Sequence, residues 1–317
     1  MQSGKLDEPL RVVVDESSFA FHDLDDPVIE EAIDDFNDLL SHMLQAGIPV
    51  SKFSLCFEFE CRTGVPLYSL LYERAAGVDV DTRHRCGALL DRCIDWDEGV
   101  DDVVTGCEVM GESLDSWSLG YAVIRSSDHL MACVGCSTAG RLGLLAVTAG
   151  GLSAELFFLV RTSGVVDYWQ SVLSREVVDS RSFFLVASRA FPRLVFHSDL
   201  DFRKFHGEYE EVYGWVVRVF IALNNYIFDS YESRKGVRHL IQSDLASRGI
   251  EISPESGQTH KNRRAISQRV IEYDGFRYSC EWHAKRLWNT DRIHFTTPGS
   301  LPGGRILVAL FVKHLDT

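Results

Sequence analysis

The chain has 317 residues, of which 45% are hydrophobic and 25% are charged, a composition typical of a folded globular protein and not of a disordered or collagen-like one. Acidic residues exceed basic ones by 46 to 32, and the formal net charge of −14 excludes a uniformly basic protein that coats nucleic acid. Residues 1–230 hold 18 Lys and Arg against 37 Asp and Glu, whereas residues 231–317 hold 14 against 9. This reversal of charge predicts two domains, 1–230 and 231–317.

The first residues and the cysteine content predict a cytoplasmic protein. The N-terminal segment lacks the basic and then apolar order of a signal peptide, and no run of about 18 apolar residues follows, so we expect no membrane partner. The eight cysteines are too dilute for a disulfide scaffold in a chain of this length, and we expect them to remain thiols.

Two helices are expected to organise the acidic N-terminal domain, which we predict to be mixed α/β. Asp26 and Pro27 begin a segment with helical apolar period that ends before Gly47, which predicts a helix over 27–46. The long apolar segment 206–231 predicts a second helix that is buried on several sides. Between them the patterns predict a half-buried strand at 51–61, a helix at 81–95, strands at 117–125 and 129–135, and a helix at 166–178.

The basic C-terminal domain is predicted to be a helix followed by a four-stranded antiparallel meander, which makes the whole chain α+β. The helix is expected over 232–249. Asp274 and Gly275 then separate two alternating segments, as in a two-residue hairpin with Tyr273 opposite Phe276. The third and fourth strands are expected over 291–297 and 304–314.

The alternation in this sheet places several ionisable side chains on one polar face. RNA cleavage by 2′-OH attack needs a base, an acid and a cation over the phosphate, and His, Glu, Arg and Lys supply these without a metal. We expect His283 or His294 to act as general base and acid, with Arg292 and Lys285 on the phosphate and Glu281 orienting a histidine. The alternative is a solvated sheet face, which carries charged residues in any case.

Basic residues around this sheet are candidates for contacts with nucleic acid. Lys and Arg clusters bind backbone phosphates, and the expected contacts are Lys261, Arg263, Arg264, Arg269 and Arg286. The aromatic residues of the hairpin are predicted to face inward, so backbone charge should dominate over base stacking. The sequence GxxxxGK[ST] is absent, which weighs against an ATPase.

A metal is the second chemical alternative. Cys133 and Cys136 have the spacing of a zinc knuckle, although cysteines in so apolar a segment are commonly small buried residues. Glu281 with His283 and His294 could also hold a divalent ion, an arrangement that we rank below metal-free chemistry. The leading expectation is therefore a protein without a cofactor, with zinc at the two cysteines as a minor alternative.

The C-terminal segments CEWHAK (280–285), RIHF (292–295) and ILVALFVKHL (306–315) support a family resemblance. Residues 232–317 resemble RelE-type toxins and, more loosely, the small ribonucleases related to barnase and the colicin nucleases. They also look like the C-terminal block of bacterial proteins from phage-defence or toxin loci. The resemblance implies a ribonuclease effector of antiviral defence or of a toxin–antitoxin system, with RNA and a protein as partners. The alternative is a non-catalytic scaffold subunit of a defence complex, whose acidic domain docks on a partner.

Overall fold

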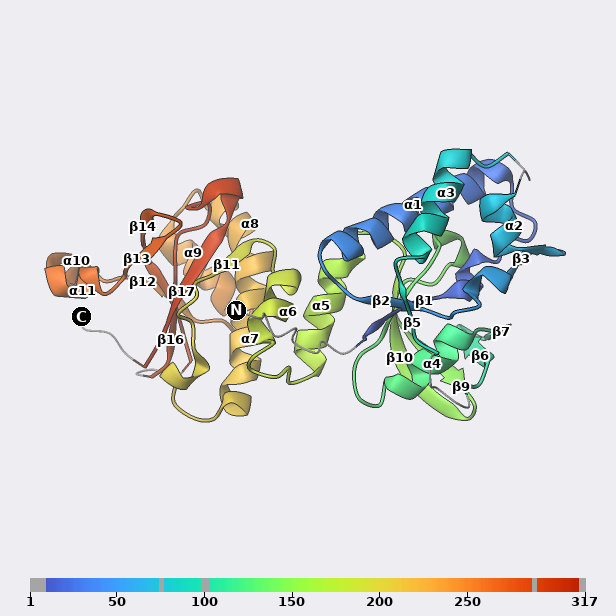
Figure 1. Ribbon diagram of the computed structural model, residues 1–317. Helices are drawn as coiled ribbons and strands as arrows, with labels where there is room; N and C mark the ends of the chain where they lie inside the picture. Colours follow the sequence, from blue (N-terminus) through green and yellow to red (C-terminus); the bar gives the residue numbers. More distant parts are fainter. Residues whose placement is uncertain (1–9, 74–76, 98–102, 287–289, 314–317) are drawn as a thin grey trace, which may run out of the picture. The chain divides into compact units, whose positions relative to one another are not determined.

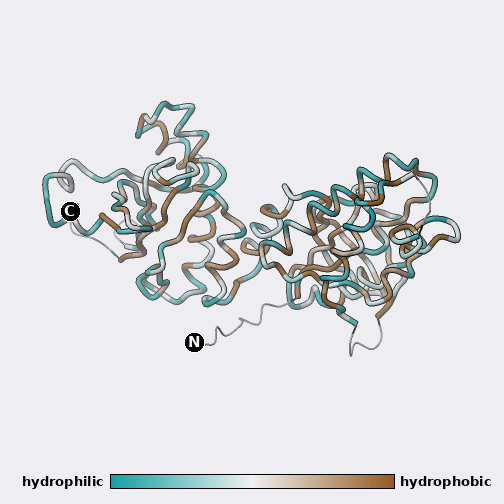
Figure 2. Tube along the Cα trace, turned by 45° about the horizontal axis from the view of Figure 1, so that its top comes forward, coloured by the Kyte–Doolittle hydropathy of each residue, from teal (hydrophilic) through white to brown (hydrophobic). Residues whose placement is uncertain are grey.

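The computed structural model describes residues 10–73, 77–97, 103–286 and 290–313, apart from the side chains at 258 and 260 (Figure 1). Helices and sheets of mixed strand direction make the chain α+β, which confirms the predicted class. It divides into two compact units, Met1–Tyr168 and Trp169–Thr317. In Figure 2 the apolar stretches of the trace run through the interior of each unit.

The division between the units lies inside helix α5 (Gly164–Arg175) and not at the charge reversal near residue 230. The physical reason is strand pairing, because β11 (Leu194–Phe196) lies parallel to the C-terminal strand β17 (Ile306–Val312). The first unit has 11 Lys and Arg against 29 Asp and Glu, and the second has 21 against 17. We therefore call residues 1–168 the acidic unit and residues 169–317 the basic unit.

The acidic unit is built on a sheet that has, in the described residues, the strand order β5-β2-β1-β8-β10-β9-β6-β7. Neighbours from β5 to β10 are parallel, and those from β10 to β7 are antiparallel. The central strands are short apolar segments, as expected for strands covered on both faces. The strands are β1 (Val12–Val14), β2 (Val50–Lys52), β5 (Ile94–Asp95), β6 (Gly106–Val109), β7 (Glu112–Asp115), β8 (Ala132–Val134), β9 (Gly143–Ala149) and β10 (Leu152–Leu159).

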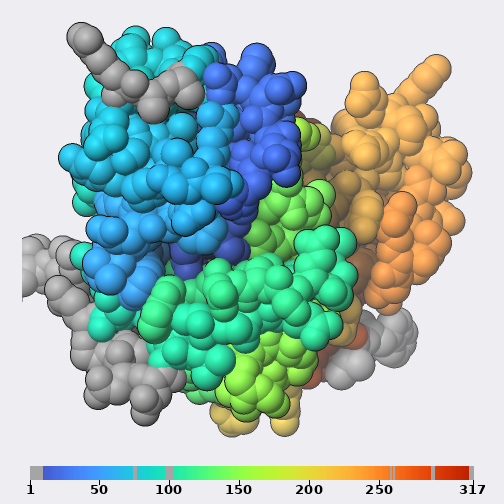
Figure 3. All heavy atoms as spheres, turned by 90° about the vertical axis from the view of Figure 1, so that its right-hand side faces the viewer, coloured from blue at the N-terminus to red at the C-terminus, as the bar shows by residue number. Residues whose placement is uncertain are grey.

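Helix α1 (Asp26–Gln45) confirms the first predicted helix, with Pro27 in its first turn. It packs beside α3 (Val80–Leu90), where Asn37 donates a 3.0 Å hydrogen bond to the carbonyl of Thr82. The predicted strand at 129–135 is also present, as β8. Figure 3 shows the blue segment of α1 above the green segment that carries the antiparallel strands.

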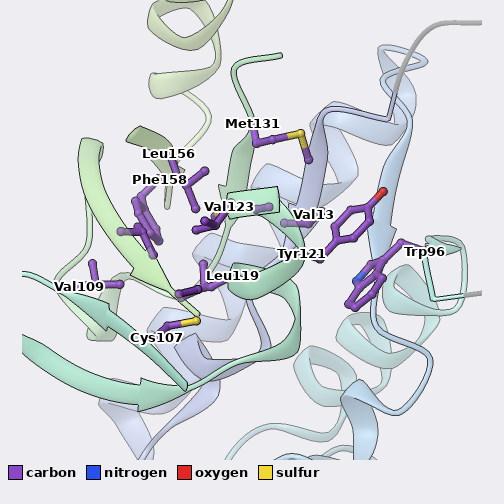
Figure 4. Close-up of a cluster of buried hydrophobic side chains, with 14 residues drawn as sticks. Val13, Trp96, Cys107, Val109, Leu119, Tyr121, Val123, Met131, Leu156 and Phe158 are labelled. Atoms are coloured by element: carbon purple, nitrogen blue, oxygen red, sulfur yellow. The ribbon is translucent and has the colours of Figure 1, made fainter. Parts of the chain in front are cut away.

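Two strands expected in the acidic unit are wrong. Residues 117–125 form helix α4 (Trp117–Arg125), because Ser116 accepts a 3.1 Å hydrogen bond from the Leu119 N–H and caps the helix. Leu119 and Val123 then pack on Val13 and Phe158 of the sheet (Figure 4). The strand expected over 51–61 is broken after β2 by a 3-10 helix, Cys56–Glu58, and resumes as β3 (Glu60–Arg62), which pairs with β4 (Val65–Pro66) ahead of α2 (Leu67–Tyr72).

The basic unit holds a sheet with the order β11-β17-β16-β15-β12 in the described residues. Its β15, β16 and β17 are antiparallel neighbours, as predicted. The helix expected over 206–231 is two helices, separated at Tyr226 by a non-helical backbone. The elements are α6 (Phe183–Ala190), α7 (Tyr209–Asn225), α8 (Ile227–Ser233), α9 (Arg238–Ala246), β12 (Ile252–Pro254), β15 (Trp282–Lys285) and β16 (Arg292–Phe295).

The predicted hairpin is present with the predicted register, Tyr273 opposite Phe276, between β13 (Val270–Tyr273) and β14 (Phe276–Ser279). Asp274 and Gly275 both have positive φ, as a type I′ turn requires. Within the described chain the hairpin is a separate sheet that covers part of the larger one, so the four strands expected as one meander are divided. Phe276, expected to face inward, is 66% exposed. Between β12 and β13, α10 (Gly257–Lys261) and α11 (Arg263–Ser267) project at the end of the unit (Figure 1).

A close backbone approach at Gly120 gives a test of the α4 packing. A Cβ atom at Gly120 would lie 1.9 Å from the carbonyl oxygen of Val104, whereas one at Gly106 would meet nothing within 4 Å. We expect Gly120→Ala to lower the free energy of unfolding by about 1–3 kcal/mol, despite the higher helix propensity of alanine. Urea denaturation measures this loss, and Gly106→Ala is the control. Equal stability of the two variants would contradict the packing described.

Candidate functional site

The two histidines of the predicted site form a cross-strand pair in the basic unit. His283 on β15 lies opposite His294 on β16, and their ring centroids are 5.2 Å apart. The next pair on this face is Lys285 opposite Arg292. The alternation of the sequence therefore placed His283, Arg292 and His294 on one face correctly.

A carboxylate that the sequence analysis missed completes the cluster. Glu255 directly follows β12, and its Oε1 atom lies 3.0 Å from Nδ1 of His283 and 3.4 Å from Nδ1 of His294. Its Oε2 atom lies 2.9 Å from Nε of Arg269. The short strand β12 contains Pro254 and lies at the edge of the sheet, where proline is tolerated. A three-residue strand with proline gives almost no sequence signal, so the pattern of the sequence does not bring Glu255 to the sheet.

Glu255, the two histidines and the two neighbouring arginines are buried. The exposed fraction is 7% for Glu255, 1% for Arg269, 5% for His283, 9% for Arg292 and 0% for His294. Burial lowers the pKa of both histidines, so their imidazoles are neutral at pH 7. Burial alone would raise the pKa of Glu255, but hydrogen bonds from His283 and Arg269 outweigh it and hold that pKa at about 2. The cluster thus contains an ionised carboxylate with Arg269 as its counter-charge.

This burial changes the catalytic interpretation. His283 and His294 lie together, but they do not line an open groove where a phosphodiester could reach both rings. Glu281, expected to orient a histidine, instead forms a surface ion pair with Arg238 at 2.9 Å. It is Glu255 that bonds His283, and Lys285 pairs with Glu251 at 3.4 Å.

The expected nucleic-acid contacts divide into two groups. Lys261, Arg263 and Arg264 are exposed on α10 and α11. Arg269, also expected to contact phosphates, is instead buried against Glu255 and is not available to a ligand. Arg286 is half-buried and donates hydrogen bonds to Asp291 at 3.0 Å and to the backbone carbonyls of residues 206 and 211, so its guanidinium is already engaged within the chain.

Cys133 and Cys136, the alternative zinc ligands, are buried at and after β8 in the acidic unit. Burial raises the pKa of both thiols well above its ordinary value, which opposes the thiolate form that binds zinc. Among the described residues, the three-donor cluster with a geometry suited to a metal is Glu255, His283 and His294.

The acidic unit has a second polar site where β1 and β8 end. The sheet continues from β1 to β2 on one side and from β8 to β10 on the other. In α/β folds, ligands bind in the crevice at the carboxyl ends of two such neighbouring strands. Asp15 pairs with Arg141 at 3.1 Å, and Arg141 donates a 2.9 Å hydrogen bond to Oγ of Ser17. Ser17, Thr138 and Arg141 contribute to the lining of a pocket of about 400 Å³.

Glu16 connects this site to helix α4. Its Oε1 atom accepts hydrogen bonds of 3.0 Å from both the Ser116 hydroxyl and the Ser118 N–H. A negative charge is favoured at the start of a helix. Burial raises the pKa of Glu16, and the neighbouring Asp15 raises it further.

Comparisons of the chain with protein-family models, with curated proteins and with solved structures found no match. The resemblance of residues 232–317 to RelE-type ribonucleases therefore stays a prediction from the sequence. In the part of the chain that the structure describes, no helix is long and apolar enough to cross a membrane.

Removal of Arg269 tests the charge balance of the cluster. Arg269→Met would leave the Glu255 carboxylate buried without its counter-charge, and we expect a loss of about 3–5 kcal/mol in the free energy of unfolding. Arg238→Met removes an exposed partner of Glu281 and should cost less than about 1 kcal/mol. Guanidinium denaturation compares the two variants. A loss for Arg269→Met no larger than that for the control would contradict the buried ion pair.

The Glu16 carboxyl group predicts a pH dependence of stability. A group whose pKa is raised by folding binds more protons in the folded chain, so its contribution falls as the pH rises through the folded pKa. The free energy of unfolding of the wild type, relative to Glu16→Gln, should therefore decline from pH 4.5 upward. Urea denaturation at a series of pH values measures this difference. The exposed Glu112→Gln is the control, and a difference that is flat or rises with pH would refute the assignment.

Proposed function

We propose that the chain is a nucleic-acid-directed protein whose basic unit binds the phosphate backbone of RNA through α10 and α11. The observation that carries the proposal is the composition of residues 256–271, which include Lys261, Arg263, Arg264 and Arg269 and no Asp or Glu. The first three of these side chains are exposed. A cationic surface segment that itself contains no acidic residue attracts a polyanion.

The segment is also fixed at both ends. Glu255 precedes α10 and Arg269 follows α11, and the ion pair between them joins the two ends of the segment. Asn262 caps α11 by accepting hydrogen bonds from the N–H groups of Arg264 and Ala265, and Arg269 donates a 2.7 Å bond to the Ala265 carbonyl. Ordered cations lose less conformational entropy on binding than free ones.

The distribution of charge supports contact through the basic unit. The acidic unit carries a formal charge of −18, from 11 basic and 29 acidic residues, and the basic unit carries +4, from 21 and 17. A polyanion is repelled by the first and attracted by the second. The acidic unit is then the part that suits a protein partner, as a scaffold subunit of a bacterial defence or toxin complex would require.

Cleavage of RNA is the second candidate. It is favoured by the grouping of two histidines, a carboxylate and arginines in one cluster, the residue types that phosphodiester cleavage without a metal uses. The burial of His283 and His294 favours binding over cleavage, because neither ring is presented to a substrate.

The salt dependence of RNA binding tests the proposal. Each phosphate contact on a single strand contributes about 0.7 to the slope of log affinity against log salt, so Lys261→Ala/Arg263→Ala should lower the slope by about 1.4. Fluorescence anisotropy with a labelled single-stranded RNA at several KCl concentrations measures this. The control Arg85→Ala/Arg92→Ala removes the same charge from exposed positions of the acidic unit.

The outcomes separate the two candidates. Equal slopes for wild type and Lys261→Ala/Arg263→Ala, or no binding by the wild type, would refute the binding surface. The same mixtures are resolved on a denaturing gel. Cleavage by the wild type in a chelator that stops with His283→Ala would establish the ribonuclease in place of a pure binding role.

A further inference from the structure

The Glu255, His283 and His294 side chains have the spacing of a metal site. One donor atom from each lies within 4.8 Å of the other two, and the Glu255 Oε1 distances to the two Nδ1 atoms are 3.0 and 3.4 Å. Zinc binds such donors at about 2.0–2.2 Å, so tetrahedral coordination separates neighbouring donors by about 3.3 Å. We propose that these three residues bind one divalent transition-metal ion inside the basic unit.

The state of His294 is an independent observation that supports a ligand. This side chain is 0% exposed, yet neither ring nitrogen has a hydrogen-bond partner in the described part of the chain. A buried polar group left unpaired destabilises the folded chain. A metal ion bound to the unprotonated ring nitrogen of His294 would give that nitrogen a partner. A β-bulge after His294 shifts its register against β17, and bulges recur where a strand aims a side chain at a site.

The donor set selects the class of metal. Two neutral imidazoles and one carboxylate suit zinc and the neighbouring first-row ions, whereas magnesium and calcium prefer oxygen donors throughout. The Arg269 guanidinium lies on Oε2 of Glu255, which fixes the carboxylate and leaves Oε1 directed at the histidines. Outer partners of this kind orient ligands in metal sites.

The surrounding charges favour an anion as the fourth ligand of the ion. Glu255 is already balanced by Arg269, and Arg292 adds a positive charge on the same face of the sheet. A divalent ion would leave this interior with an excess of positive charge, which favours an anion such as hydroxide at the fourth position. The ion would join the end of β12 to β15 and β16 and so raise the stability of the unit.

Metal binding by the full chain tests the inference directly, without RNA. Protein stripped with a chelator is dialysed against zinc, and bound metal is measured by mass spectrometry together with the melting temperature. We expect stoichiometric zinc and a raised melting temperature in the wild type and in the control His239→Ala, whose side chain is exposed. His294→Ala and Glu255→Gln should lose both effects.

Cobalt(II) provides a readout that needs no variant to fold. The wild type should show the strong visible absorption of four-coordinate cobalt without the sulfur-to-cobalt charge-transfer band that cysteine ligands would give. Loss of this spectrum on addition of zinc supports the site. Absence of stoichiometric zinc and cobalt in the wild type, or full zinc in folded His294→Ala, overturns it. Because RNA is absent from these measurements, either proposal can fail alone.

Discussion

The buried carboxylate of Glu255 is the constraint on which the basic unit depends. An ionised carboxylate in the interior must be paired and hydrogen-bonded, because an isolated one would be too costly to bury. Glu255 satisfies this requirement with Arg269 on one oxygen and His283 on the other. Arg269 directly precedes the hairpin and His283 lies on β15, so one side chain connects the edge strand β12, the hairpin and the adjacent strand β15.

The division of the chain into two compact units assigns its negative charge to one of them. A boundary at residue 230, where the charge reverses along the sequence, would fall inside helix α8 of the basic unit. With the division after Tyr168, the whole negative excess belongs to one folded unit, which carries −18 against +4 for the other. The parallel pairing of β11 with β17 is responsible, because it joins residues 194–196 to a sheet that is otherwise C-terminal. Long-range pairing of this kind leaves no local signal in composition.

Sequence patterns predicted correctly the features that depend on residues close together in the chain. The turn at Asp274 and Gly275 fixed the hairpin register, and strand alternation placed His283 opposite His294. Residues 117–125 were misread because their apolar content alone does not separate strand from helix, and the capping hydroxyl of Ser116 decides the matter. Glu255 was missed for a different reason, since its position depends on a strand of three residues that forms only against β15. Burial of the polar face was likewise invisible, because alternation reports which residues share a face and not what covers it.

The Glu255 cluster and the cationic segment of α10 and α11 share the ion pair between Glu255 and Arg269, which links the two proposals. Helices α10 and α11 lie between Glu255 and Arg269, so the ion pair that anchors the buried carboxylate also joins the ends of the segment that presents Lys261 and Arg263. An ion bound to Oε1 of Glu255 would restrict this carboxylate and, through Oε2, its arginine partner. Metal binding would then order a surface that lies outside the metal site, since fewer conformations of α10 and α11 would remain to be lost when a phosphate backbone binds. The histidines would then need no contact with RNA to influence the proposed binding, which reconciles their burial with the function that we propose.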